Sequence, residues 1–80
     1  MSRRKKRQAD AERFGAVVRE LRERRGWTQE QLAERAEMNA SYLGFVERGD
    51  NVPTLTIIIQ IADGLGVAPE DLLRETMRRR

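Results

Sequence analysis

Two side chains that carry much of enzyme chemistry at neutral pH are missing from this sequence. Its 80 residues include no Cys and no His, which removes thiolate nucleophiles, imidazole bases and the usual zinc ligands. Carboxylates and hydroxyls remain, but without a partner base. We therefore expect no enzymatic activity, no metal and no cofactor, and the chemistry to look for is the binding of charged or polar partners.

Much of the positive charge lies at the two ends of the chain. One basic run holds Arg78 to Arg80, and the other consists of Arg3, Arg4, Lys5, Lys6 and Arg7. These runs take eight of the 16 basic residues, so positions 8–77 hold eight basic against 13 acidic residues, a balance of −5. A basic patch is the electrostatic footprint of nucleic-acid binding, and the ends are therefore candidates to reach phosphates. The alternative is that they only keep the chain soluble.

The segment TQEQLAERAEMNASYLGFVER contains polar residues at positions suited to cap helices. Thr28 suits an N-cap, and Gln31 can return a hydrogen bond to its amide, which predicts a capping box and the start of a helix. Asn39 is a strong N-cap for a second helix, in which Leu43 and Val46 fall three residues apart on one face. Two short helices joined by a tight turn form a helix-turn-helix, whose second helix can enter a DNA major groove.

Hydrophobic periodicity predicts three further helices around this pair. Apolar residues from Phe14 to Leu21 recur at helical spacing, Thr54 caps a second stripe, and Pro69 stands at the first position of a last helix. The expected fold is all-α, a bundle of five helices near 10–25, 28–36, 40–48, 55–65 and 69–76. We expect its core to combine Leu21, Leu32, Ala36, Leu43, Val46, Leu55, Ile58, Ala62, Leu65 and Leu72, with Leu73 beside them.

The chain divides into one domain with two short ends. Residues 1–8 are predicted to form a flexible basic arm, 9–77 the helix-turn-helix domain, and 78–80 a basic tail. No apolar run approaches the roughly 20 residues that span a bilayer, and MSRRKKRQAD lacks the apolar stretch of a signal peptide. We therefore expect a soluble, cytoplasmic protein that does not bind membranes.

The stretches LRERRGWTQEQLAERA, SYLGFVERGDNVPTL and IADGLGV resemble the XRE-type regulators, the superfamily of phage repressors and Cro, which implies a lambda-repressor-like fold. The resemblance runs from about Phe14 to Leu73. It implies a largely buried ion pair between Arg22 and Glu47. One departure is Glu37, where the family usually has a glycine in the turn. A left-handed conformation there costs a non-glycine residue roughly 1 kcal/mol, which suggests a wider or rotated turn.

The resemblance also implies that the first helix of the motif meets the DNA backbone with its N-terminus. Thr28 and Gln29 would then offer a backbone amide and a side-chain amide to a phosphate. The outer face of the second helix supplies the remaining candidate contacts: Asn39, Ala40, Ser41, Tyr42, Gly44, Phe45 and Arg48. Because long polar readers are missing from its first turn, specificity would depend on DNA shape, on Asn39 and Arg48, or on the basic arm in a minor groove.

These features favour a sequence-specific transcriptional regulator that binds double-stranded DNA as a homodimer on a pseudo-palindromic operator. The expected dimer interface is Ile57, Ile61, Gly64 and Met77, unless Ile57 is an isolated exposed residue. No small-molecule ligand is evident. The alternative is a protein-interaction module, antitoxin-like or adaptor-like, which an exposed Phe45 and the acidic middle of the chain would favour. The short length and SYLGFVERGD resemble controller proteins of restriction–modification systems, and a stand-alone regulator is equally compatible.

Overall fold

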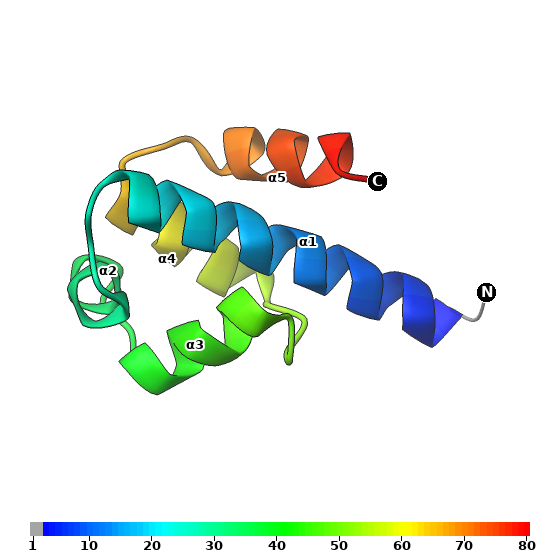
Figure 1. The fold of residues 1–80 in the computed structure, drawn as a ribbon, viewed down its shortest axis with the longest axis horizontal. Coiled ribbons are helices and arrows are strands. Elements are labelled where there is room, and N and C mark those ends of the chain that lie inside the picture. Colours follow the sequence, from blue (N-terminus) through cyan, green and yellow to red (C-terminus); the bar gives the residue numbers. More distant parts are fainter. Residues whose placement is uncertain (1–2) are drawn as a thin grey trace.

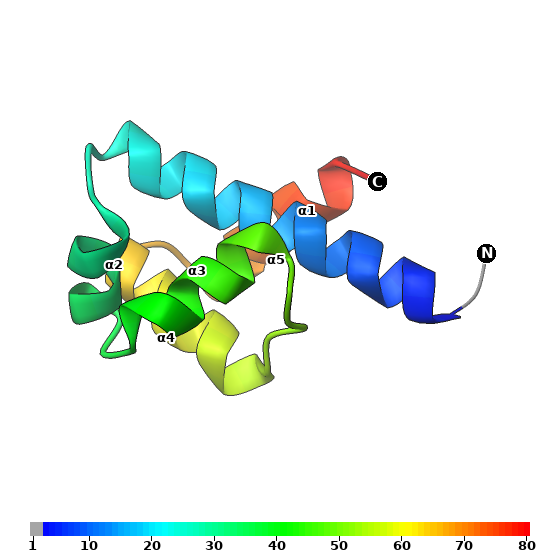
Figure 2. The same ribbon diagram turned by 60° about the horizontal axis from the view of Figure 1, so that its bottom comes forward.

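The structure is a bundle of α-helices. It is a computed structural model that describes residues 3–80, with side chains from Lys5 onward. In this part of the chain there are five helices and no strand, as predicted. They are α1 (Arg3–Arg24), α2 (Gln29–Arg35), α3 (Ala40–Arg48), α4 (Leu55–Leu65) and α5 (Pro69–Arg78). The long α1 crosses the bundle, with α5 on one side and α2 and α3 on the other (Figures 1 and 2). None of the described helices has the length and apolar character to cross a membrane.

Helix α1 starts at Arg3, seven residues before the predicted start at Asp10. The intervening residues include neither Gly nor Pro and are mostly good helix formers, so nothing local stops the helix there. Gln8 Nε2 donates to the carbonyl oxygen of Gly49 over 3.2 Å and ties this part of α1 to the end of α3. Residues 3–8 therefore continue the helix, where a flexible arm was expected.

The core lies at the centre of the bundle, and every helix contributes to it. Its central cluster is Phe14, Val17, Val18, Leu32, Ala33, Leu43, Val46, Ile61, Ala62, Leu65 and Leu72. The predicted core residues Leu32, Ala36, Leu43, Val46, Ala62, Leu65 and Leu72 are all buried. Leu21 and Ile58 are only partly buried and pack against the edge of the cluster.

Two leucines were wrongly placed in the core. Leu55 is 70% exposed and Leu73 is 43% exposed. Leu55 is the first residue of α4, and a helical side chain leans toward the N-terminus, here toward the preceding loop instead of the core. Leu73 follows the buried Leu72 on α5 and so points about 100° away from it around the helix.

Two residues predicted for a dimer interface are used inside the single chain instead. Ile61 is fully buried in the core. Gly64 is buried as well, and a Cβ built on it would lie 2.9 Å from the backbone nitrogen of Ala36. The close backbone approach that a glycine allows is thus between α4 and α2. Of the other two predicted interface residues, Ile57 is partly buried against the core cluster and Met77 is exposed.

The turn between α2 and α3 contains the one described non-glycine residue with a positive φ, Glu37 at 54°. Ala36 and Glu37 close the end of α2 through bonds to Leu32 and Glu34 carbonyls, and Met38 N–H donates to Ala33 O over 2.9 Å. The turn is therefore short and hydrogen-bonded, and it takes the left-handed conformation for which the family usually has glycine. The clash of Cβ with the backbone costs about 1 kcal/mol.

Glu37→Gly is expected to raise the free energy of unfolding by about 1 kcal/mol, because it removes this clash at an exposed position. Equilibrium urea denaturation followed by circular dichroism measures the change. The matched control is Glu34→Gly, an exposed glutamate within α2, which should lower stability by a similar amount. Equal destabilisation by both substitutions would contradict the strain at Glu37.

Candidate nucleic-acid interface

The N-terminus of α2 is closed by the predicted capping box. Gln31 N–H donates to Thr28 Oγ1 over 3.1 Å, and Thr28 N–H donates to Gln31 Oε1 over 2.8 Å. The single amide hydrogen of Thr28 is therefore occupied within the chain. Its hydroxyl, which accepts from Gln31, still has a hydrogen to donate outward.

A buried ion pair joins α1 to α3, where the resemblance implied it. Arg22 Nε and Nη2 donate to the Glu47 carboxylate over 2.7 and 3.0 Å. The side chains are only 12% and 2% exposed. The hydrogen bond to Glu47 raises the pKa of the Arg22 guanidinium, so the arginine stays charged.

Two further hydrogen bonds extend this pair to the motif's first helix. Arg22 Nη1 donates to the carbonyl oxygen of Trp27 over 2.7 Å, which fixes the loop before α2. Gln29 Nε2 donates to Glu47 Oε1 over 3.0 Å. One of the two amide hydrogens of Gln29 is thus used internally, and the second is left for the phosphate contact that was predicted for it.

The N-terminus of α3 is capped by Asn39, as predicted. Its Oδ1 accepts from the N–H groups of Ser41 and Tyr42 over 2.8 and 3.3 Å. Because the cap occupies the oxygen, only the NH₂ group of Asn39 is available for a base or phosphate.

The seven residues of α3 and its cap that were predicted to face DNA differ in their exposure to solvent. Four are exposed: Asn39, Ser41, Phe45 and Arg48. Ala40 and Tyr42 are partly buried and pack against the core cluster, while Gly44 is buried. A Cβ on Gly44 would lie 3.2 Å from Arg48 Nη1 and 3.5 Å from Gln29 Oε1. The N-terminus of α2 and the outer face of α3 therefore form one surface.

Three interactions on or near this surface were not predicted from the sequence. Gln29 bonds Glu47, Arg48 Nε donates to Asp50 Oδ2 over 3.0 Å, and the Arg48 guanidinium lies 5.1 Å from the centre of the Phe45 ring. The spacing in ERGD places Arg48 and Asp50 two residues apart, which is a weak hint of their pairing. The other two depend on side-chain directions that a sequence does not give.

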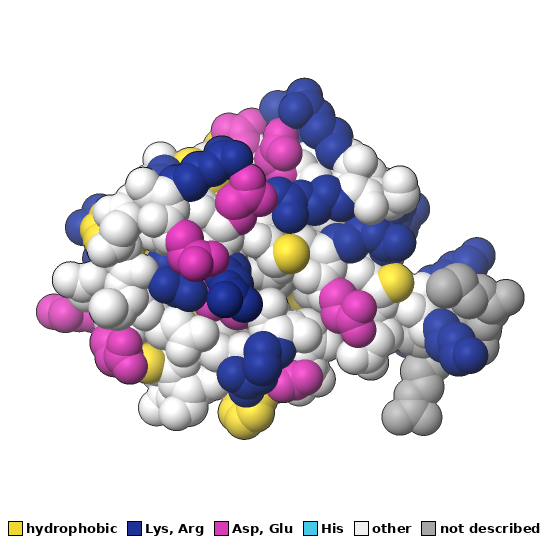
Figure 3. Space-filling model, viewed as in Figure 1, with side chains coloured by type: hydrophobic (Ala, Val, Ile, Leu, Met, Phe, Trp, Pro, Cys, Tyr) yellow, Lys and Arg dark blue, Asp and Glu magenta, His cyan; other side chains and the backbone are white. Residues whose placement is uncertain are grey.

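The basic ends of the chain differ in their surroundings. Lys5, Lys6 and Arg7 have exposed side chains on the first turns of α1, whereas the side chains of Arg3 and Arg4, also predicted DNA contacts, lie outside the described ones. On the face shown in Figure 3, basic and acidic side chains are interspersed. Among the described side chains, no extended patch of one sign covers that face.

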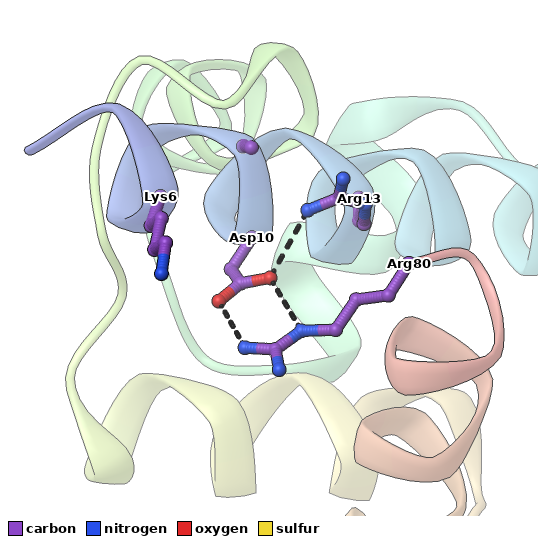
Figure 4. A pocket seen from close by; sticks show the side chains of 5 residues that line it. Lys6, Asp10, Arg13 and Arg80 are labelled. Atoms are coloured by element: carbon purple, nitrogen blue, oxygen red, sulfur yellow. Dashed lines mark hydrogen bonds and ion pairs between the residues drawn. The ribbon is translucent and has the colours of Figure 1, made fainter. Parts of the chain in front are cut away.

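The C-terminal arginines pair with acidic side chains of α1 and α5. Arg80 donates to Asp10 from Nε and Nη2 over 3.1 and 2.7 Å, beside Arg13, which bonds the same carboxylate (Figure 4). These bonds, above all the one from Arg80, lower the pKa of the Asp10 carboxyl. Arg79 bonds Glu20, and Arg78 bonds Glu75 over 2.9 Å. The predicted basic tail is therefore largely neutralised where it lies.

Comparison with known proteins identifies the family to which the chain belongs. A family model described as a helix-turn-helix domain matches residues 13–76. The chain is a member of the XRE-type helix-turn-helix transcriptional regulators. It is 36% identical over 63 residues to the uncharacterized HTH-type transcriptional regulator YazB of Bacillus subtilis, covering 79% of this chain and 91% of that protein.

Two further relatives are control proteins by name. The control protein C.BamHI of Bacillus amyloliquefaciens is 38% identical over 61 residues, 75% of each chain. The crystal structure of the restriction–modification controller protein C.AhdI from Aeromonas hydrophila matches with a TM-score of 0.77 and 41% identity, covering 80% of this chain and 97% of that one. The match covers nearly all of the C.AhdI chain and supports the all-α helix-turn-helix fold described above.

The Arg22–Glu47 pair gives a test of how the motif is held. Arg22→Met alone or Glu47→Leu alone should lower the free energy of unfolding by about 3–5 kcal/mol, because each leaves a buried charge without its partner. The double variant should be markedly more stable than either single variant, because it buries no unpaired charge. Urea denaturation of all four proteins measures this. A double variant as unstable as the sum of the singles would show that the two groups do not interact.

Proposed function

We propose that this transcriptional regulator binds a pseudo-palindromic DNA operator as a homodimer in the cytoplasm, and that it acts by binding and not by catalysis. The observation that carries the proposal is the single surface formed by the N-terminus of α2 and the outer face of α3, where Gln29 and Arg48 both lie close to Gly44. In a helix-turn-helix that surface places the first helix on the phosphates and the second in the major groove.

The positions of the exposed apolar side chains support the formation of a dimer. Six large apolar side chains of the described residues are exposed, and five of them lie on the loop after α3, on α4 or on α5: Val52, Leu55, Ile59, Leu73 and Met77. Val52, Leu73 and Met77 line a hollow of about 280 Å³ together with Pro53 and Ile58. Exposed apolar surface of this kind favours a protein contact. We assign it to the dimer interface in place of Ile61 and Gly64.

The second candidate function is a protein-interaction module on the same scaffold. Phe45, 43% exposed on the outer face of α3, favours it, because an aromatic ring is a frequent anchor of protein interfaces. The ring also carries the Arg48 guanidinium at 5.1 Å, and this pairing suits a nucleic-acid surface equally well.

One experiment separates these candidates. Footprinting on the region upstream of the gene, together with selection from a randomised DNA library, should give protection of two half-sites about 34–36 Å apart. A library that yields no enriched sequence at low salt would overturn the DNA-binding proposal and favour the protein partner.

The basic side chains on the first turns of α1 are expected to increase DNA affinity by contacting phosphates of the DNA backbone. Changing Lys5, Lys6 and Arg7 together to Gln is expected to flatten the plot of log affinity against log salt, by about 0.9 for each phosphate that the variant no longer neutralises. Fluorescence anisotropy at several salt concentrations measures the slope.

The control for this prediction neutralises the same number of charges elsewhere. Arg19, Arg74 and Arg78 are exposed on α1 and α5, and changing these three to Gln should leave the slope nearly unchanged. Equal slopes for the two triple variants would show that the start of α1 makes no phosphate contact of its own.

The dimer assignment is tested at Leu73. Leu73→Glu should give a folded monomer with much weaker operator binding, because two copies of the new carboxylate would be desolvated at the interface. Analytical ultracentrifugation measures the oligomeric state. Ala16→Glu, at an exposed position on α1, adds the same charge and should leave the dimer intact. A Leu73→Glu protein that still sediments as a dimer would remove α5 from the interface.

A further inference from the structure

The Arg48 side chain has neighbours on three sides. Its Nε donates to Asp50 Oδ2 over 3.0 Å, beyond the C-terminus of α3. The guanidinium lies 5.1 Å from the centre of the Phe45 ring, one turn back along the helix. Its Nη1 lies 3.2 Å from the point where a Cβ on Gly44 would stand. The side chain therefore folds back along the outer face of α3, toward the helix N-terminus.

Gly44 supplies the space for this orientation. Glycine is less favourable than alanine within a helix, so its presence in the middle of α3 calls for a reason in the packing. Apart from Gln29, whose amide atoms lie at 3.5 and 3.7 Å, the close neighbour of the absent Cβ is Arg48 itself. The guanidinium thus occupies the gap between Phe45 and the N-terminus of α2.

The hydrogen bond to Asp50 decides which donors remain. A guanidinium has five N–H groups, and the one on Nε is occupied by the Asp50 carboxylate. The two Nη groups are left to act as a fork. The edge of guanine in the major groove offers two acceptors, O6 and N7, and a bidentate arginine is the commonest contact to them. Ala40 and Ser41 are short, and Tyr42 packs against the core cluster, so we expect no side chain from the first turn of α3 to compete for that edge.

We propose, building on the DNA-binding function proposed above, that Arg48 reads a guanine in each half-site of the operator. Asp50, Phe45 and Gly44 are positioning residues that aim its two Nη groups at that base. In this proposal the base is read from the last turn of α3 and not from its first turn.

The first test compares the parent protein with Arg48→Ala on DNA. Selection from a randomised library should give the parent a symmetric motif with one guanine in each half-site. Changing that guanine to adenine in a synthetic duplex should weaken binding by the parent about tenfold or more, the usual discrimination of a bidentate pair. The same change should have almost no effect on binding by Arg48→Ala. Anisotropy titrations give the ratio of affinities.

The positioning role is tested with two substitutions at Asp50. Asp50→Ala and Asp50→Asn remove the same negative charge, so both should raise affinity for every DNA to a similar extent. Only asparagine keeps an oxygen that can accept from Arg48 Nε. The discrimination between guanine and adenine should therefore fall most in Asp50→Ala and be partly restored in Asp50→Asn.

Gly44→Ala separates positioning from folding. The added methyl group would stand 3.2 Å from Arg48 Nη1, so the guanidinium must move. Discrimination for guanine should fall several-fold, while the midpoint of thermal unfolding should stay equal to that of the parent or rise, because alanine favours the helix. A merely structural glycine would give a lower midpoint with unchanged discrimination, and that result would refute its role here.

The outcomes distinguish this inference from the function on which it rests. A parent protein that selects no DNA motif would overturn both. A parent that selects a motif whose guanine preference survives in Arg48→Ala would overturn only the reading role of Arg48. Full discrimination in Asp50→Ala would overturn the positioning role of Asp50.

Discussion

The arrangement of the DNA-facing surface depends on one buried ion pair. Arg22 of α1 and Glu47 of α3 bond through two donors at 2.7 and 3.0 Å, and the remaining bonds of the pair reach Trp27 and Gln29. A buried charge is tolerated only when it is fully bonded, so a shift of any of these elements would leave part of the network unsatisfied. A buried pair is weak evidence for high stability. Its effect here is to fix where the N-terminus of α2 stands relative to α3.

The close crossing of α1 and α3 adds a steric constraint to the electrostatic one. A Cβ on Gly15 would lie 2.2 Å from the carbonyl oxygen of Val46, so only glycine permits this approach. Gly49 ends α3 with φ of 76° and packs against Glu12 of α1. Its carbonyl oxygen accepts the hydrogen bond from Gln8, also on α1. The back of α3 is thus fixed on α1 along its second half, and its outer face is free to meet a partner.

Local signals were sufficient to predict most of the fold. Caps and periodicity placed α3 and α4 at their observed bounds, α2 within one residue at each end and α5 within two. The start of α1 was predicted at Asp10 and lies at Arg3. Residues 3–9 include no capping residue or helix breaker that would mark a helix start at Asp10. Leu55, Ile61 and Gly64 were misassigned for a different reason: a helical stripe shows which side of a helix is apolar, but not which neighbour covers each position along it.

The candidate site was less accessible to sequence reasoning than the fold. The ion pair came from a resemblance and not from the spacing of Arg22 and Glu47, which are 25 residues apart. The residues around Arg48 were each named as DNA contacts except Asp50, whose role depends on the rotamer of Arg48. Contacts of this kind follow from tertiary packing, which a single sequence leaves undetermined.

The helical start of α1 also decides between two ways in which the basic residues could meet DNA. An α-helix with its side chains is about 10–12 Å wide, whereas the minor groove of B-DNA is about 6 Å wide. Residues 3–8 in the observed conformation therefore do not fit into a minor groove, which the sequence alone had left open for them. The exposed side chains of Lys5, Lys6 and Arg7 are expected to contact phosphates instead. In this geometry we expect the start of α1 to add affinity without reading bases, and specificity to come from α3 and from DNA shape.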